Sequence, residues 1–401
     1  MPDKGLAPRS CLTANGRVSL SRRRWRGPAG GVVPVDRLLD AAEATVSLGT
    51  RELCCRASAD SRSFARAAAG LKQLGQLPLS TELLRQVVEE EGKAVLRASE
   101  SGELKPGWAA ADCPVQTPAG EATRLYLGTD GFMVRVLSDQ EKQARRRQVV
   151  SARRRRGRAK PVNNPGKPPL PPLPPRRKGA DGPYKEFKLV QFHDESMEHR
   201  LVSVTRRRCH EAGRIMRRDA GRIGFHEAKE RLGNVDGGPW IVKQIQRRGI
   251  NLTGLCLDFY HLGQNVNQAK GITYGQDNPQ GSQWAAGVLH AAKHDGYDAL
   301  FDQLLEWRKG QRGRAKRQEA DRLLHYVCER KEMIHYDTFM AHGWRISSST
   351  TESQCGVVPA RVKGGGKRWD GDNAEAVMAL EAAIQSNLWT TYWVSCAPRA
   401  N

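Results

Sequence analysis

The stretch "KEFKLVQFHDESMEHRLVSVT", residues 185–205, indicates the fold class of this chain. Apolar and polar side chains alternate in "KEFKLVQFHD" and again in "RLVSVT", which is the pattern of two adjacent antiparallel strands. Upstream, "RLYLGTDGFMVRVL" (residues 124–137) also predicts a strand, with Asp130 and Gly131 in its middle. Three strands therefore open the predicted sheet.

The segments after residue 205 add helices and further strands. Residues 210–223 predict a basic helix. "RLGNVDGGPWIVKQIQRRG" (231–249) predicts a short strand that ends at Asp236, a Gly-Gly turn, and a helix with proline at its start. "LTGLCLDFYHL" (252–262) predicts an apolar strand that ends at Asp258. This order predicts an α/β protein with a mixed sheet, antiparallel at first and then parallel, flanked by helices.

The N-terminal part of the chain has a different character. Residues 1–47 form a poorly defined segment, in which "GRVSLSRRRW" (16–25) fits one strand of a small hairpin. Residues 48–115 predict a helical region, because apolar side chains recur every three or four residues and Ser80 is placed to cap the longer helix. Two helices joined by a tight turn fit either a DNA-binding helix-turn-helix or an ordinary helical hairpin.

The rest of the chain divides around a helical segment. Residues 120–279 form the first part of the predicted α/β core, and residues 280–345 are helical throughout, without a strand pattern. We interpret this helical segment as an insertion that interrupts the core. Residues 346–401 return to it, with a helix that carries Glu352 and a last amphipathic helix at about residues 373–386.

Charge points to a polyanionic partner. Lys and Arg number 65 against 43 Asp and Glu, a formal net charge of +22, which favours binding to nucleic acid or another anionic surface. Residues 142–178 hold fourteen Lys or Arg, no acidic residue and eight of the 21 prolines, so we predict a solvated basic arm or long loop that contacts phosphate, with "KPPLPPLPPRRK" (167–178) extended. The side chains that we expect to contact DNA are Arg145, Arg146, Arg147, Arg153, Arg154, Arg155, Arg156, Lys367 and Arg368, with Trp344 as a base-stacking candidate or a core tryptophan.

Several classes of protein are disfavoured. No run of about 18 uncharged apolar residues exists, so a membrane protein is not expected, and the N-terminus has no apolar run typical of a signal peptide. The nine cysteines are scattered and contain no CxxC pair, which predicts free thiols of an unexported, cytoplasmic protein rather than disulfides or a cysteine zinc site.

Three carboxylates carry the predicted chemistry. Two-metal cleavage of a phosphodiester needs about three carboxylates from separate elements, and Mg²⁺ prefers oxygen ligands. Asp130 lies within an apolar strand, where a charge is costly unless it binds something, although an edge position facing water is the alternative. Asp236 ends a strand at a glycine turn and Glu352 lies on a helix; taken singly, each is as consistent with an ordinary solvated residue.

The blocks around these residues resemble, in order, those of bacterial insertion-sequence transposases of the ISKra type. The blocks are "LGTDGFMVRV" (127–136), "VDGGPWI" (235–241), "LDFYHL" (257–262), "STTESQC" (349–355) and "RVKGGGKRWDGDNAEAVMALEAAIQSNLWTTYW" (361–393). The resemblance runs from about residue 48 to residue 393. It implies a DDE enzyme with a ribonuclease-H-like core, related to the Mutator and hAT transposases.

The resemblance also implies site residues and partners. It makes Asp130, Asp236 and Glu352 the catalytic acids that hold two Mg²⁺ (or Mn²⁺) ions, and Asp258 with His261 the accessory [C/D]xxH motif. The expected substrates are double-stranded DNA at element ends and at the target. The expected assembly is a homodimer or higher oligomer on DNA, in a bacterial cytoplasm.

The chain departs from the family pattern at three places, and these keep two alternatives open. Ser347, Ser348 and Ser349 replace a glycine-rich turn, Pro359 should kink or end the glutamate helix, and spaced N-terminal cysteine pairs are missing. The first alternative is a catalytically decayed basic DNA-binding protein. The second is a ribonuclease-H-like nuclease without strand transfer, which would need no large helical insertion.

Overall fold

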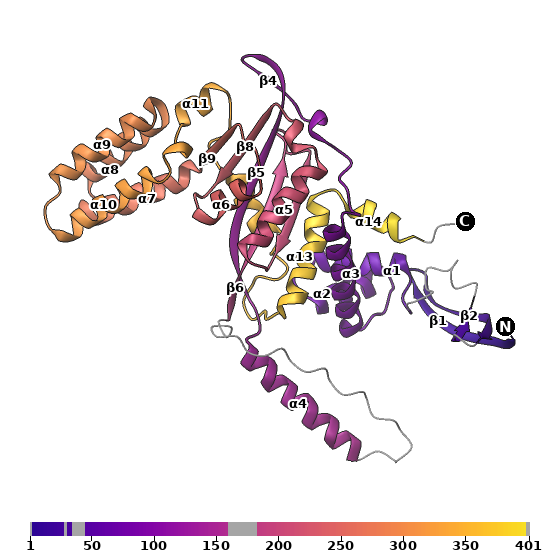
Figure 1. Ribbon diagram of the computed structural model, residues 1–401. Helices are drawn as coiled ribbons and strands as arrows, with labels where there is room; N and C mark the ends of the chain where they lie inside the picture. Colours follow the sequence, from indigo (N-terminus) through magenta and orange to yellow (C-terminus); the bar gives the residue numbers. More distant parts are fainter. Residues whose placement is uncertain (1, 28–29, 34–44, 159–182, 398–401) are drawn as a thin grey trace.

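The computed structural model describes residues 2–27, 30–33, 45–158 and 183–397, and its centre is a mixed sheet (Figure 1). The strands lie in the order β7 (Arg200–Thr205), β6 (Tyr184–His193), β5 (Gly120–Arg135), β8 (Glu230–Val235) and β9 (Gly254–Leu257). β5, β6 and β7 are antiparallel neighbours, whereas β8 and β9 run parallel to β5. The predicted α/β class with an antiparallel start and a parallel continuation is confirmed.

Helices cover both faces of this sheet. α5 (Cys209–Arg222) lies on one face, where the hydroxyl of Ser203 donates to the buried carboxylate of Asp219 at 2.7 Å. α6 (Pro239–Arg247) packs closely beside α5. The opposite face carries α12 (Ser349–Val357), which lies so close to β5 that a Cβ atom on Gly128 would stand 1.9 Å from Oγ1 of Thr351. Gly128 and Asp130 are two residues apart on β5, so Asp130 shares the face that α12 covers.

A second helical group packs beside β7. α13 (Gly371–Gln385) runs along this strand, and the hydroxyl of Ser386 accepts from the backbone N–H of Val202 at 2.8 Å. α3 (Thr81–Ser101) lies against α13, where a Cβ atom on Gly92 would meet the carbonyl oxygen of Ala376 at 2.3 Å. One face of α3 is therefore buried in the protein core, which favours the helical hairpin over a free DNA-reading helix.

The remaining helices of this group complete its packing. α1 (Leu48–Ala59) and α2 (Phe64–Leu74) both contact α3, and α14 (Trp389–Cys396) contacts α1 and α13. Ser63 and Ser80 cap α2 and α3 through their side chains, as the sequence predicts for Ser80.

The N-terminal segment is more ordered than the sequence predicts. β1 (Asp3–Thr13) pairs antiparallel with β2 (Gly16–Gly27), and β3 (Gly30–Val32) adds to the other edge of β2. The hairpin interpretation of residues 16–25 is confirmed. Within the segment 1–47, which the sequence leaves poorly defined, residues 3–13, 16–27 and 30–32 form strands. Residues 34–44 lie outside the described part of the chain.

The first part of the basic arm is a helix, where the sequence predicts a solvated arm or long loop; the extended conformation is predicted only for residues 167–178. α4 (Asp139–Arg158) extends away from the sheet in Figure 1. Its sequence contains no proline and a single glycine, Gly157. The carboxylates of Asp139 and Glu141 in its first turn stabilise the positive end of the helix dipole. The prolines begin at residue 161, so they do not act on this helix. Residues 159–178 of the predicted arm lie outside the described residues.

The predicted helical insertion is helical in the structure. η3 (Phe225–Glu227) lies in the core between α5 and β8. After β9, α7 (Phe259–Thr273) leads into α8 (Pro279–His290), η4 (Ala291–Asp295), α9 (Gly296–Gly310) and α10 (Arg314–Cys328). The chain then returns to the core through η5 (Lys331–Met333) and α11 (Tyr336–Ala341). These helices lie beyond the β9 edge of the sheet (Figure 1), and Trp284 stacks on Trp307 in their interior with ring centroids 4.3 Å apart.

No helix in the described ranges combines the length and the apolar character that crossing a membrane requires.

Candidate functional site

Two of the predicted acids lie side by side. Thr129 of β5 is in parallel register with Val235 of β8, so the next residue of each chain segment, Asp130 and Asp236, follows at the same level. Neighbouring strands are about 4.8 Å apart, and register partners point to the same face of a sheet. Both carboxylates are half-buried. The structure therefore brings together two acids that are 106 positions apart in the sequence.

Glu352 reaches the same face of the sheet from α12, through a set of polar contacts at the start of this helix. The side-chain amide of Asn234 donates to the carbonyl oxygens of Arg345 and Ser347, at 3.1 and 3.0 Å. These bonds attach the segment before α12 to β8, two residues before Asp236. Glu352 lies in the first turn of α12 with its side chain 43% exposed, so it is open to a ligand.

Asp258 connects two helix starts. Its Oδ1 accepts from the backbone N–H groups of Tyr260 and His261 at the start of α7. Its Oδ2 accepts from the backbone N–H of Ser348 at 2.6 Å and from the Ser348 hydroxyl. The same hydroxyl lies 3.2 Å from Oε1 of Glu352, so its single proton can bond either carboxylate. Asp258, which is 1% exposed, therefore fixes the position of the Glu352 helix.

His261, the other member of the accessory motif, lies among the acids. Its Nε2 is 3.6 Å from Oε1 of Glu352, and its Nδ1 is 3.1 Å from the side-chain oxygen of Gln264. A positive charge on the His261 ring would also lower the pKa of Asp130. The imidazole thus interacts with two of the three predicted acids, and it is anchored by the first turn of α7.

The electrostatics of Asp130 suit a cation ligand. Burial raises the pKa of Asp130, and repulsion from the neighbouring Asp236 raises it further. The backbone N–H of Gly131 donates to Asp130 at 2.6 Å and acts in the opposite direction, as does a hydrogen bond with the Cys355 thiol. A bound cation would remove the repulsion between the two carboxylates, and an all-oxygen set of ligands fits a hard cation such as Mg²⁺ or Mn²⁺.

The structure does not bring the oxygen atoms of Asp130, Asp236 and Glu352 all within 4.8 Å of one another. Within residues 2–27, 30–33, 45–158 and 183–397, the three metal-ligand side chains whose ligand atoms all lie within 4.8 Å of one another are Cys113, Asp194 and His199. One oxygen of Asp236 already accepts from the backbone N–H of Gly238 at 2.8 Å, which closes the turn before α6.

The helical insertion contributes a cation at the edge of this site. The Arg330 guanidinium donates to the carbonyl oxygen of Gly237 at 3.0 Å, next to Asp236, and lies over the ring of Tyr326 at 4.0 Å. No sequence signal points to this contact, because Arg330 is one of many arginines in a helical segment. The sequence does contain signals for Asn234 and Cys355 as site residues. Asn234 is a polar side chain in a short apolar strand, and Cys355 follows Glu352 by one helical turn.

The predicted DNA-contacting side chains have different environments. Arg145, Arg147, Arg154 and Arg155 are exposed on α4 and Arg146 is half-buried, whereas the side chains of Arg153 and Arg156 lie outside the described part of the chain. Lys367 donates to the carbonyl oxygen of Arg361 at 3.0 Å, and Arg368 pairs with Glu141 at 2.7 Å. Trp344 packs against Phe339 and Gly254, which favours its core interpretation.

A cationic pocket lies where α4 begins. It has a volume of about 440 Å³ and is open to solvent between α2, α4 and the segment before α13. Six of its lining residues are cationic and only two are acidic; the cations are Arg62, Arg85, Arg145, Arg361, Lys367 and Arg368. Burial lowers the pKa of Arg361 to about 10, and its guanidinium lies 4.4 Å over the ring of Phe64. An anion such as a phosphate group fits these surroundings.

Comparison of the chain with models of known protein families gives no match, and comparison with curated proteins gives no significant match.

Proposed function

We propose that this chain is a DNA transposase that cuts and joins phosphodiesters with two Mg²⁺ or Mn²⁺ ions held by Asp130, Asp236 and Glu352. The observation that carries the proposal is the approach of Asp130 and Asp236 on neighbouring parallel strands, on the face that the Glu352 helix covers. Partly buried carboxylates that repel each other are costly unless a cation joins them.

The fold is compatible with this proposal. A mixed sheet flanked by helices agrees with a ribonuclease-H-like core, and the helices from α8 to α11 interrupt it before Glu352. An insertion at this place would shape the active site, and Arg330 contacts the edge of the site through the carbonyl oxygen of Gly237. A nuclease without strand transfer has no evident use for such an insertion.

Each side chain of the site would have its own role in the reaction. Bound divalent ions would lower the pKa of the attacking water or 3′-hydroxyl and stabilise the leaving oxygen. Asp258 would hold α12 through Ser348 and thereby fix where Glu352 lies. His261 would hold the carboxylate of Glu352 in place, since its Nε2 is 3.6 Å from that group. The Gly238 N–H would fix the orientation of Asp236.

DNA binding would use the positive surface on the α4 side of the molecule. The exposed arginines of α4 and the cationic pocket at its start supply charge for the phosphates of a duplex, whether the DNA is an element end or a target. Joining two ends requires at least two copies of the active site, so we propose a homodimer or a higher oligomer on DNA. The proposed setting is the bacterial cytoplasm.

The test is Mg²⁺-dependent cleavage of a plasmid that carries the coding region with its flanking DNA. We expect the Asp130→Asn substitution to reduce cleavage about 10³-fold, because each lost metal ligand removes several kcal/mol of transition-state stabilisation. Glu121→Gln is the matched control, since Glu121 is an exposed carboxylate of the same strand. It should leave cleavage unchanged.

Three other results would argue against the proposal. Cleavage that survives Asp130→Asn would place the active site elsewhere. DNA binding without any metal-dependent cleavage by the unmodified chain would favour the non-catalytic alternative. Cleavage without joining of the freed ends to a second plasmid would favour a nuclease without strand transfer.

A further inference from the structure

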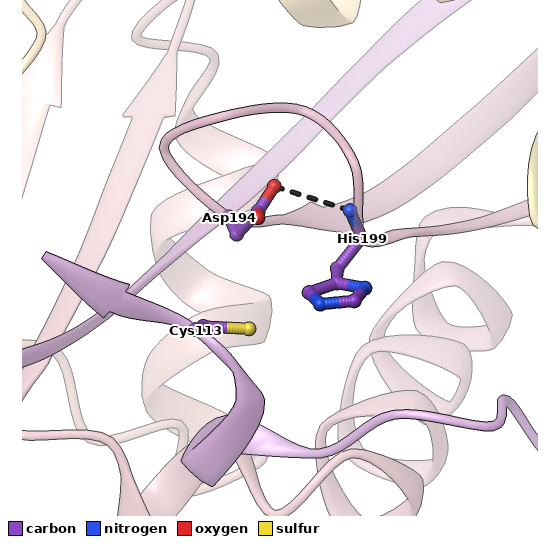
Figure 2. A group of neighbouring side chains, drawn as sticks. All are labelled: Cys113, Asp194 and His199. Carbon is purple, nitrogen blue, oxygen red and sulfur yellow. Dashed lines mark hydrogen bonds between the residues drawn. The ribbon is translucent and has the colours of Figure 1, made fainter.

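Three metal-ligand side chains from distant parts of the sequence meet at the end of the sheet away from the carboxylates. Cys113 precedes β4 (Pro114–Thr117), while Asp194 and His199 stand at the two ends of the turn that joins β6 to β7. One ligand atom from each of the three lies within 4.8 Å of the other two. Figure 2 shows the thiol of Cys113 pointing toward the imidazole of His199, with the carboxylate of Asp194 beside them.

The surroundings hold these side chains in place. Asp194 accepts from the backbone N–H of His199 at 3.2 Å through Oδ1, and from the hydroxyl of Ser196 at 2.6 Å through Oδ2. The ring of His199 stacks on Trp108, with centroids 5.3 Å apart. Cys113 and Asp194 are both buried, at 2% and 6% exposure. Metal ligands in proteins have such supporting contacts, which orient the ligand before the ion arrives.

We propose that Cys113, Asp194 and His199 bind one Zn²⁺ ion. Thiolate, imidazole and carboxylate are the three ligand types that zinc takes in proteins, whereas Mg²⁺ avoids sulfur and nitrogen. In a tetrahedral zinc site, bonds of about 2.0 to 2.3 Å place the ligand atoms roughly 3.5 Å apart. Small side-chain rotations would therefore bring the three around one ion. His199 is half-exposed, so a water molecule could supply a fourth ligand.

The zinc site is distinct from the proposed catalytic site. The backbone N–H of Arg124 donates to the carbonyl oxygen of Cys113 at 3.0 Å, which places Cys113 beside Arg124 on β5. Asp130 is six positions further along this strand, about 20 Å away. A zinc ion here would connect the entrance of the core at β4 to the β6–β7 turn, two segments that no other covalent or metal link joins among the described residues.

A Cys-His-Asp nucleophilic site is a weaker interpretation of the same cluster. Asp194 bonds the backbone of His199 and not its ring, so the carboxylate does not orient the imidazole as a general base requires. Burial, with a smaller effect from Asp194, raises the pKa of the Cys113 thiol to about 12, the opposite of an activated nucleophile.

The test uses the full chain, stripped of metal and titrated with Zn²⁺ and with Co²⁺. We expect about one Zn²⁺ per chain, and a thiolate-to-cobalt charge-transfer band in the near ultraviolet when Co²⁺ binds. Cys113→Ser should abolish this band and weaken Zn²⁺ binding by at least about 100-fold, because loss of a supporting contact alone weakens metal binding about 10- to 100-fold. His199→Asn should weaken binding by a similar factor.

Two controls make the result specific. Cys328→Ser removes an exposed thiol on the insertion, and Asp130→Asn changes the proposed catalytic site; both should leave the cobalt band and the zinc affinity unchanged. Far-ultraviolet circular dichroism of each metal-free variant verifies folding. If Cys113→Ser does not fold, His199→Asn and the unmodified chain decide. A chain that shows no cobalt–thiolate band, or one whose band survives Cys113→Ser or His199→Asn, would overturn the zinc site.

Discussion

Gly128 sets the distance between β5 and the helix that carries Glu352. It stands two residues before Asp130, and the Thr351 hydroxyl of α12 fills the space that a side chain at this position would need. That hydroxyl is buried and has no hydrogen-bond partner among the described residues. The contact between Gly128 and Thr351 is therefore steric, and substitutions of these two residues should be energetically coupled.

We expect Gly128→Ala to lower the free energy of unfolding by about 1–3 kcal/mol, because its Cβ forces α12 away from the sheet. Thr351→Ala removes the hydroxyl that would clash, so adding it to Gly128→Ala should restore most of the loss. Urea unfolding of the two single variants and the double variant measures the coupling. Gly70→Ala on α2 is the control, since open space surrounds Gly70 and alanine favours a helix. Additive effects of Gly128→Ala and Thr351→Ala would disprove the contact.

At the scale of elements, α4 shows where local composition misleads. Fourteen cations and eight prolines in residues 142–178 predict one solvated arm or long loop, yet the prolines begin only at residue 161 and the part before residue 159 is helical. Contacts outside the helix anchor its start: Lys142 pairs with Asp370 at 2.8 Å, and Glu141 pairs with Arg368. Both partners are more than 220 positions away, so no local pattern could reveal them.

The exposed arginines of α4 should determine how DNA affinity depends on salt. Replacing Arg145, Arg147, Arg154 and Arg155 together by Gln should reduce the slope of log affinity against log salt by up to about 4, since each phosphate contact contributes about 0.9. Fluorescence anisotropy with duplex DNA at several salt concentrations measures this slope.

A variant with the same change in charge is the control for this experiment. Replacing the exposed Arg214, Arg217, Lys243 and Arg247 by Gln alters α5 and α6, on the face of the sheet opposite the carboxylates. If both variants reduce the slope equally, binding follows net charge alone and α4 is not the contact surface.

At the scale of the whole molecule, buried polar groups join the strands of the sheet to the Glu352 helix, which follows the insertion. Arg124, 3% exposed, pairs with Glu230 at 2.6 Å and with Glu195 at 3.0 Å. Next to this pair, His193 is buried: its Nδ1 lies 2.7 Å from the carbonyl oxygen of Asp194, and its Nε2 lies 3.1 Å from the Thr350 hydroxyl of α12. The sheet and the Glu352 helix therefore share one buried polar layer.

The stability of this layer should depend on pH through His193. Burial lowers the pKa of His193 from 6.5 to about 4. Between pH 4 and pH 6.5, His193 is therefore protonated in the unfolded chain and neutral in the folded chain. The contribution of the neutral His193 side chain to the free energy of unfolding is fully present above pH 6.5. It is lost as the pH falls to about 4, a loss of at most about 3 kcal/mol.

Urea unfolding of the metal-free chain between pH 7 and pH 4.5 measures this dependence. His193→Gln should flatten the fall in stability over this range, while His325→Gln, which changes a 74% exposed side chain, should not. If the stability of His193→Gln falls as steeply as that of the unmodified chain, other groups cause the acid sensitivity.

The sequence by itself determined the elements of the core and their order. Period-two alternation in residues 185–205 and the short apolar runs that end at Asp236 and Asp258 were enough, because neighbouring residues encode a strand locally, even though helices bury both faces of β6 and β7. Pro359 ends α12 at Val357 as predicted, because proline blocks a helix locally. The carboxylates themselves were predicted from their settings and from the family resemblance.

Tertiary structure alone decided what these residues contact. Asp258 looks like an accessory catalytic residue in sequence, but both of its oxygens hold helix starts together. Cys113 has no metal spacing along the chain, yet it lies beside Asp194 and His199. The helix α13, which the sequence predicts to be amphipathic, is buried on several sides between α3 and β7. Distances between residues 80 or more positions apart depend on how elements pack, and packing is a property of the assembled fold rather than of any local segment.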